Sequence, residues 1–168
     1  MFTPTHLGPS LFFFSLKPRL FNGWALLLGS VMMDFENVFL VIINNARGCP
    51  ECFHHGSFHT ILGAIFGSLV LAFILKKLAK PLDKISLKLK LEQSFSLKTL
   101  FFSSLLGWIL HILADSLVHR DVFLFWPLKI TPTLISWTLY WPLSSMFAIL
   151  GLFSLIILLI GIVKSKKT

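Results

Sequence analysis

"TLFFSSLLGWILHILADSLV", residues 99–118, is the stretch that decides the fold class. Its length is about what an α-helix needs to cross the hydrocarbon core of a bilayer, which is about 30 Å thick. Asp115 is its one charged residue, and His111 lies one helical turn earlier. The stretch therefore predicts a membrane helix that carries two polar side chains, although lipid strongly disfavours such groups.

The composition extends this prediction to the whole chain. Of 168 residues, 55% are hydrophobic and 13% are charged, and the mean hydropathy is +0.83. Soluble domains are less apolar than this. The sequence predicts an all-α integral membrane protein with a single membrane-embedded domain over residues 1–168. The net charge of +8 does not indicate nucleic-acid binding, because the lysines gather at the ends of hydrophobic stretches.

The hydrophobic segments predict a compact bundle of about four transmembrane helices, preceded by a short N-terminal partial helix. The lysine-rich segment 80–98, with "KISLKLKL" in its middle, predicts either an interfacial helix or a short extended piece. The expected hydrophobic elements are residues 7–16, 20–43, 58–75, 99–118 and 134–163.

The positive charges predict how the bundle sits in the membrane. They form three groups at alternate ends of successive elements: Lys17 with Arg19, seven lysines within 76–98, and the lysines at the C-terminus. Positively charged flanks favour the cytoplasm, which predicts a multi-pass protein of the cytoplasmic (inner) membrane. The loops 44–59 and 119–133 then meet on the non-cytoplasmic side. Membrane lipids are expected partners, with anionic headgroups at segment 76–98.

Ionisable side chains of three helices fall at one depth in this arrangement. At about 1.5 Å per helical residue from the cytoplasmic anchors, His6 lies about 17 Å away and Asp34 about 22 Å. His111 and Asp115 lie about 20 and 26 Å away. Such residues converging from several helices are typical ligands of zinc or a similar divalent ion. Coordination would also relieve the cost of burying them.

The spacing of these residues supports one shared site unevenly. His111 and Asp115 are four residues apart and share a helical face, which His119 continues one turn later. Asp34 and Glu36 are two residues apart and do not share a face of a regular helix. Either one of them points away or the helix loosens there.

The loop before the third element adds further ligand types just above this layer. His54 and His59 are five residues apart, which favours a turn through Gly56. Cys49 and Cys52 form a disulfide, a second zinc site with the nearby histidines, or two free thiols; the sequence leaves these alternatives open.

Four blocks of sequence resemble a known family. They are "THLG" (5–8), "GSVMMDFEN" (29–37), "HHGSFHT" (54–60) and "GWILHILADSLVHRDVFLFWPL" (107–128). Together they are similar to the YdjM-like family of inner-membrane proteins, described as metal-dependent hydrolases, over nearly the whole chain. The resemblance strengthens one set of candidate metal ligands: His6, Asp34, His54, His59, His111 and Asp115.

The chain departs from the family pattern at three other positions within these blocks. Glu36 stands where the family has Asp, His55 where it usually has Arg, and Phe58 where it often has Thr. The resemblance implies that His55 either removes a phosphate-binding cation or replaces it with a titratable group. The blocks also resemble those of zinc-dependent phospholipase C and related nucleases, which by analogy implies phosphoester chemistry.

The expected function is that of a membrane-bound metal-dependent hydrolase. It would act on a phosphoester or lipid-type substrate at the outer half of the membrane, with one to three divalent ions. Zinc is the preferred ion, and manganese and magnesium are alternatives. Such ions activate water and polarise the scissile group. Glu36 is expected to be a ligand or general base, and His55 or His119 to protonate the leaving group.

Other interpretations of the same residues compete with this one. A small membrane transporter or ion-binding protein would use the layer as an ion or proton relay. The short chain, the lack of repeats and the confinement of polar groups to the outer half disfavour it. A purely structural subunit leaves the layer unexplained, although Asp34 and Asp115 could hydrogen-bond helices together. A further alternative is that interfacial or loop positions alone account for His6, His119 and Asp121.

Overall fold

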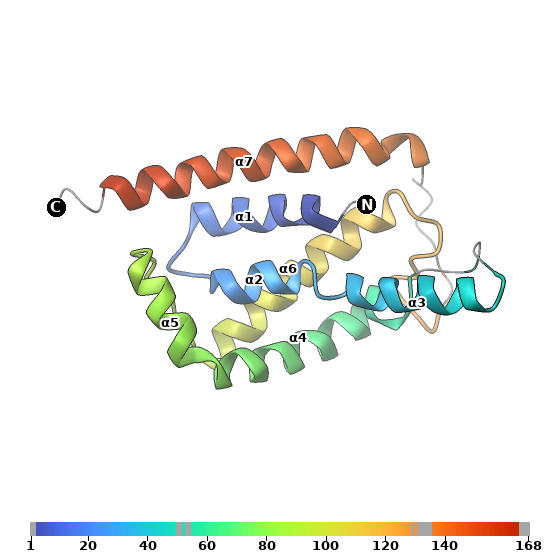
Figure 1. Cartoon of the computed structure of the whole chain (residues 1–168), viewed down its shortest axis with the longest axis horizontal. Coiled ribbons are helices and arrows are strands. Elements are labelled where there is room, and N and C mark those ends of the chain that lie inside the picture. The colour runs from blue at the N-terminus through green and yellow to red at the C-terminus, as the bar shows by residue number, and fades with distance from the viewer. Residues whose placement is uncertain (1–2, 50–51, 53–54, 129, 131–135, 165–168) are drawn as a thin grey trace.

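The computed structural model of the chain describes residues 3–49, 52, 55–128, 130 and 136–164. Every regular element in these residues is helical, which confirms the all-α bundle (Figure 1). The elements are η1 (Thr3–His6), α1 (Leu7–Leu16), α2 (Gly23–Gly29), α3 (Asp34–Ala46), η2 (Ser57–His59), α4 (Ile61–Lys77), α5 (Ala79–Lys88), α6 (Leu97–Ser116), η3 (Trp137–Leu139) and α7 (Tyr140–Lys164).

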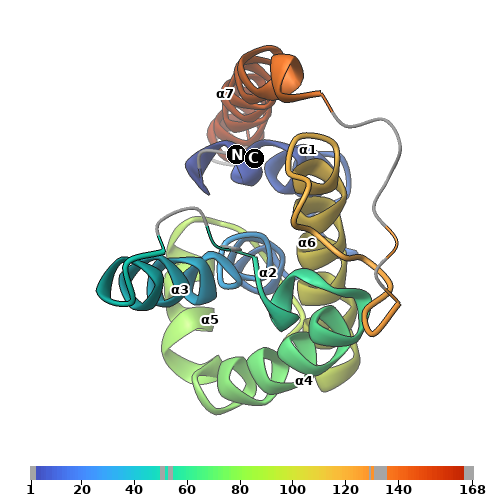
Figure 2. The ribbon, with the colours of Figure 1, turned by 90° about the vertical axis from the view of Figure 1, so that its right-hand side faces the viewer.

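The α6 helix packs against both α2 and α4, while α1 packs against α7 (Figure 2). Small residues bring the backbones of α2 and α6 together. A Cβ atom added to Gly29 would lie 2.8 Å from Ser104 Cα, and one added to Gly107 would lie 2.9 Å from Ser30 N. Close backbone approach at small residues is a common way for membrane helices to associate.

Three segments are long and apolar enough to cross a membrane: Gly23–Ala46, Leu97–Ser116 and Trp137–Val163. The α4 and α5 helices meet at 76°, and the expected count of four is reached if they form one bent span. The ten residues of α1 extend about 15 Å, half the hydrocarbon thickness, as expected of a partial helix.

The expected element over 20–43 is divided into α2 and α3 by a break in the chain, which agrees with the alternative that the helix loosens near Asp34. The Asp34 N–H donates to the Val31 carbonyl at 3.2 Å, a three-residue spacing in place of the α-helical four. Of the two alternatives for the lysine-rich segment, the structure has a helix, α5, over Ala79–Lys88.

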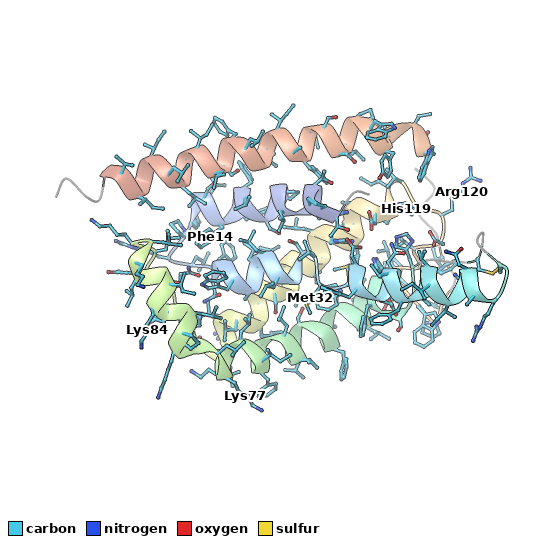
Figure 3. All side chains as sticks on the ribbon, viewed as in Figure 1. Phe14, Met32, Lys77, Lys84, His119 and Arg120 are labelled. Atoms are coloured by element: carbon cyan, nitrogen blue, oxygen red, sulfur yellow. A yellow bond between two sulfur atoms is a disulfide. The ribbon has the colours of Figure 1, made fainter. Side chains whose placement is uncertain are left out.

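The third element begins later than residue 58, because Ser57–His59 forms a separate 3₁₀ turn. Thr60 then caps α4, its side-chain oxygen accepting from Gly63 N at 2.9 Å. The break after α2 and this turn before α4 lie close together, because His59 of the turn is 3.7 Å from Asp34 at the start of α3. In Figure 3, His119 and Arg120 mark one end of the bundle, and Lys77 and Lys84 lie toward the opposite one.

Candidate metal centre

One wall of the site is the face of α6 that carries His111 and Asp115. Both residues are buried, each with 1% of its surface exposed. His111 Nε2 lies 3.0 Å from Asp115 Oδ2, as their four-residue spacing on a helix predicts. Val118 and Ile112 beside them are also buried, so the face of α6 that carries His111 and Asp115 is covered by the rest of the bundle.

The break between α2 and α3 supplies the second wall and fixes the His111 ring. Because Asp34 N–H donates to Val31, the Ser30 carbonyl is left to accept from His111 Nδ1 at 2.7 Å. A carbonyl oxygen only accepts, so the proton must be on Nδ1. His111 Nε2 then points at two carboxylates, Asp115 at 3.0 Å and Asp34 Oδ1 at 3.3 Å.

The turn before α4 brings His59 to the same place. His59 is fully buried, and its Nε2 lies 3.7 Å from Asp34 Oδ1 while its Nδ1 lies 3.5 Å from Glu36 Oε2. Both acidic residues face the cluster because the loosened chain at the start of α3 departs from the regular helical rotation. Burial opposes the charged form of His59, but these two carboxylates outweigh it and raise its pKa.

Glu36 also holds the turn itself. Its carboxylate accepts from Phe58 N at 2.9 Å and from Ser57 Oγ at 3.2 Å. A Cβ atom on Gly56 would lie 2.6 Å from Glu36 Cδ, so a larger residue there would displace the Glu36 carboxylate from this position. The structure thus shows Glu36 positioning the turn that carries His59.

His6 closes the cluster from the N-terminal side. Its ring stacks on that of His111 with centroids 3.7 Å apart and planes 17° apart, and its Nε2 lies 3.3 Å from Asp115 Oδ1. Neither ring nitrogen of His6 has a hydrogen-bond partner among the described residues. Gly8 lets this segment pack closely on α7, because a Cβ atom at position 8 would overlap the backbone carbonyl group of Phe147.

A second group lies beside the first, at the outer rim. His55 Nδ1 is 2.8 Å from Asp121 Oδ2, and His55 Nε2 is 3.6 Å from Asp115 Oδ2. His119 Nε2 is 3.9 Å from Asp115 Oδ1. Burial lowers the pKa of the His119 imidazole to about 4, so its ring is neutral at pH 7.

The structure therefore brings most of the predicted ligands together in one cluster. The nitrogen and oxygen atoms of Asp34, His59, His111 and Asp115 that could hold an ion lie within 4.8 Å of one another, with His6 alongside. His54 lies outside the described residues, and it is His55 that reaches the cluster. Asp121 was not among the predicted site residues. Its position two residues after His119, in the same sequence block, was the available signal.

The two cysteines are paired in a disulfide, Cys49–Cys52, which decides among the three alternatives left open by the sequence. The described chain has no free cysteine. The disulfide lies at the end of the bundle that carries the histidine cluster, beyond the C-terminus of α3.

The family model described as YdjM inner membrane protein matches the chain over residues 1–168. The chain belongs to this family. No curated protein and no solved structure matches it. Membership in the YdjM family establishes an inner-membrane type of protein, in agreement with the apolar helices, and leaves the chemistry to be argued from the site.

Proposed function

We propose that this YdjM family protein is a membrane-bound metal-dependent hydrolase acting on a phosphoester of a lipid or lipid-linked substrate. The observation that carries the proposal is the orientation of His111. Its Nδ1 proton is committed to the Ser30 carbonyl, so in a neutral ring the Nε2 lone pair faces the carboxylates of Asp34 and Asp115. Lone pairs that face one another in a buried site repel, and a shared cation removes that repulsion.

The buried atoms without partners fit a metal ion as well. Both ring nitrogens of His59 and Asp34 Oδ2 have no hydrogen-bond partner among the described residues. Each such group costs about 1–3 kcal/mol if it stays unsatisfied. The donor separations of 3.0, 3.3 and 3.7 Å match the roughly 3.4 Å between ligands held about 2.1 Å from a tetrahedral ion.

The donor set favours zinc, with manganese as an alternative, because it mixes imidazole nitrogens with carboxylate oxygens. The residues that would hold the ion are Asp34, His59, His111 and Asp115, with His6 as a further ligand. A divalent ion there supplies a Lewis acid that activates water and polarises a phosphoryl or ester oxygen. The Ser30 carbonyl keeps His111 in the tautomer suited to ligation, in the manner of outer partners at metal sites.

The acid–base roles predicted for the other residues have unequal support. Glu36 is engaged with Ser57 and Phe58, which favours a positioning role over that of a base. The predicted proton donors His55 and His119 have less support, because the His55 Nδ1 proton goes to Asp121 and His119 is held neutral.

An apolar pocket supports a lipid-type substrate. It has a volume of about 320 Å³, lies between η1 and the start of α3, and reaches Asp34. Phe35 and Val38 line it and are more than half exposed, on a span that faces the hydrocarbon of the bilayer. An acyl or prenyl chain lying in this pocket would bring its headgroup to the cluster. The pocket is lined by Thr3, Pro4, Leu7, Val31, Asp34, Phe35 and Val38.

We place the cluster on the non-cytoplasmic side of the inner membrane. The lysines of α4 and α5 lie at the other end of the bundle, where positive charge favours the cytoplasm and attracts anionic headgroups (Figure 3). The Cys49–Cys52 disulfide supports this orientation, because disulfides persist in oxidising compartments.

A transporter is the rival proposal, and the distribution of buried charge disfavours it. Among the described residues, the buried titratable side chains all belong to the cluster. Buried polar groups toward the lysine end, such as Asn22, Ser103 and Ser104, are neutral and bond helices to one another. A proton or ion relay needs titratable or coordinating groups along the path.

The test is metal analysis joined to a lipid assay. The protein is purified in mild detergent, supplied with zinc or manganese, freed of excess ion and measured for bound metal. Release of phosphate or fatty acid from a panel of lipids is then followed. Wild type and the control Asp83→Asn, on α5, are expected to keep metal and activity, whereas His111→Ala and Asp115→Asn lose both. Wild type without stoichiometric metal after repletion would overturn the proposal.

A further inference from the structure

The second group of side chains at the outer rim is built like the first. His55, His119 and Asp121 offer ligand atoms that lie within 4.8 Å of one another. They come from two loops, one before α4 and one after α6, that are tied together by a bond from Ile61 N to the Leu124 carbonyl at 2.9 Å. The group is therefore held in place by the fold.

His55 is oriented in the same way as His111. Asp121 Oδ2 accepts from the backbone N–H of His55 at 3.2 Å and lies 2.8 Å from its Nδ1. A carboxylate at this position keeps the proton on Nδ1 and turns the Nε2 lone pair inward, toward Asp115. A carboxylate behind a histidine is the usual outer partner of a metal-binding imidazole.

Asp115 connects the two groups. Its Oδ2 lies 3.0 Å from His111 and 3.6 Å from His55, and its Oδ1 lies 3.3 Å from His6 and 3.9 Å from His119. One buried carboxylate thus faces imidazole nitrogens from both groups at once. This arrangement is suited to a carboxylate that bridges two ions, one beside each group of imidazoles.

We propose that His55 and His119 hold a second divalent ion, with Asp121 as the outer partner that orients His55, and that Asp115 bridges this ion to the first. This inference rests on the proposed function and extends it to a two-metal centre. Two ions close together clamp the attacking and leaving oxygens of a phosphoryl group. The centre therefore selects phosphate monoesters or diesters over carboxylic esters, so the substrate is a lipid that carries a phosphoester headgroup.

The experiment counts ions in the full-length protein in detergent. His119→Ala removes a rim ligand, and Asp121→Asn keeps the side-chain volume while weakening the hold on His55. The matched control is Arg120→Ala, which changes the exposed residue between them. Helical circular dichroism and the gel-filtration profile report whether each variant folds. The expected result is about two zinc ions per chain in wild type and Arg120→Ala, and about one in each rim variant.

A spectroscopic readout separates paired from isolated ions. With manganese in place of zinc, wild type is expected to give the electron paramagnetic resonance spectrum of an exchange-coupled pair. His119→Ala is expected to give the spectrum of a single isolated ion. If wild type binds about one ion and the rim variants also bind about one, the second position is wrong while the first stands. If wild type binds none, both proposals fail. Unchanged binding of about two ions by both folded rim variants would also overturn this assignment.

Discussion

The His6 ring lies stacked on the His111 ring, with centroids 3.7 Å apart, although one residue precedes α1 and the other lies in α6. His6 is 1% exposed, and its nitrogens find no hydrogen-bond partner among the described residues. The contact therefore serves packing and, under the proposed function, metal ligation. It fixes the N-terminal segment on the bundle and aims a further nitrogen at Asp115.

Two substitutions of His6 are expected to separate these roles. His6→Phe keeps a ring on His111 but has no nitrogen, so the melting temperature of the metal-free protein stays close to that of metal-free wild type while zinc affinity falls. His6→Ala also loses the ring packing, which costs about 2–4 kcal/mol of stability. Zinc titration and thermal melting in detergent measure the two effects. Wild-type zinc affinity in His6→Phe would show that His6 is not a ligand.

Glu36 is expected to act on the turn and not on the ion. Glu36→Gln retains an oxygen that accepts from Phe58 N, so its metal content should remain that of wild type. Glu36→Ala removes both acceptors, loosens the turn that carries His59, and is expected to lower stability by about 1–3 kcal/mol. Metal analysis of the two variants decides the matter, since a direct ligand would lose metal in Glu36→Gln as well.

The close crossing of α2 and α6 is expected to influence zinc affinity, although Gly29 is not itself a candidate ligand. Gly29→Ala places a methyl group against the backbone of Ser104 and moves α2 away from α6. The Ser30 carbonyl then shifts from His111 Nδ1, so both the melting temperature and zinc affinity fall. Gly161→Ala on α7 is the control, because a Cβ there meets nothing within 4 Å. Equal behaviour of the two variants would contradict the close packing of this crossing.

Removal of metal is expected to destabilise the protein. An ion that binds only the folded state adds about 2.7 kcal/mol when its free concentration is a hundred times the Kd. A strong chelator should therefore lower the melting temperature of wild type and of Asp83→Asn. Asp115→Asn should melt at the same temperature with and without chelator. A chelator-sensitive melt in this variant would place the stabilising ion elsewhere.

The orientation in the membrane is expected to expose the disulfide end outside the cytoplasm. A membrane-impermeant maleimide added to intact spheroplasts should label Cys52, which is exposed, only after reduction of the disulfide. In a background of Cys49→Ser and Cys52→Ser, Lys84→Cys should be labelled only after the membrane is permeabilised. The reverse pattern of labelling would invert the topology.

The sequence determined the class of protein and the layer of polar residues. Lengths of apolar sequence near 20 residues, matched to the bilayer thickness, fix how many helices can span it, and the helical rise fixes the depth of each side chain. That was enough to place His6, Asp34, His111 and Asp115 at one level. It was enough as well to select His59 as a candidate ligand from the motif that surrounds it.

Lateral position and ring orientation were decided by the tertiary structure. Depth along a helix does not state which helix lies beside which, so the stacking of His6 on His111 followed only from the packing of α1 and α6 against their neighbours. The close crossing of α2 and α6 sets Ser30 beside His111, and the break after Gly29 leaves the Ser30 carbonyl free to accept from the His111 ring. Asp121 lies in a loop whose path the helical period does not encode, so its contact with His55 had no signature in spacing. Local sequence sets the length and the depth of each element, whereas contacts between distant segments set the distances on which the chemistry depends.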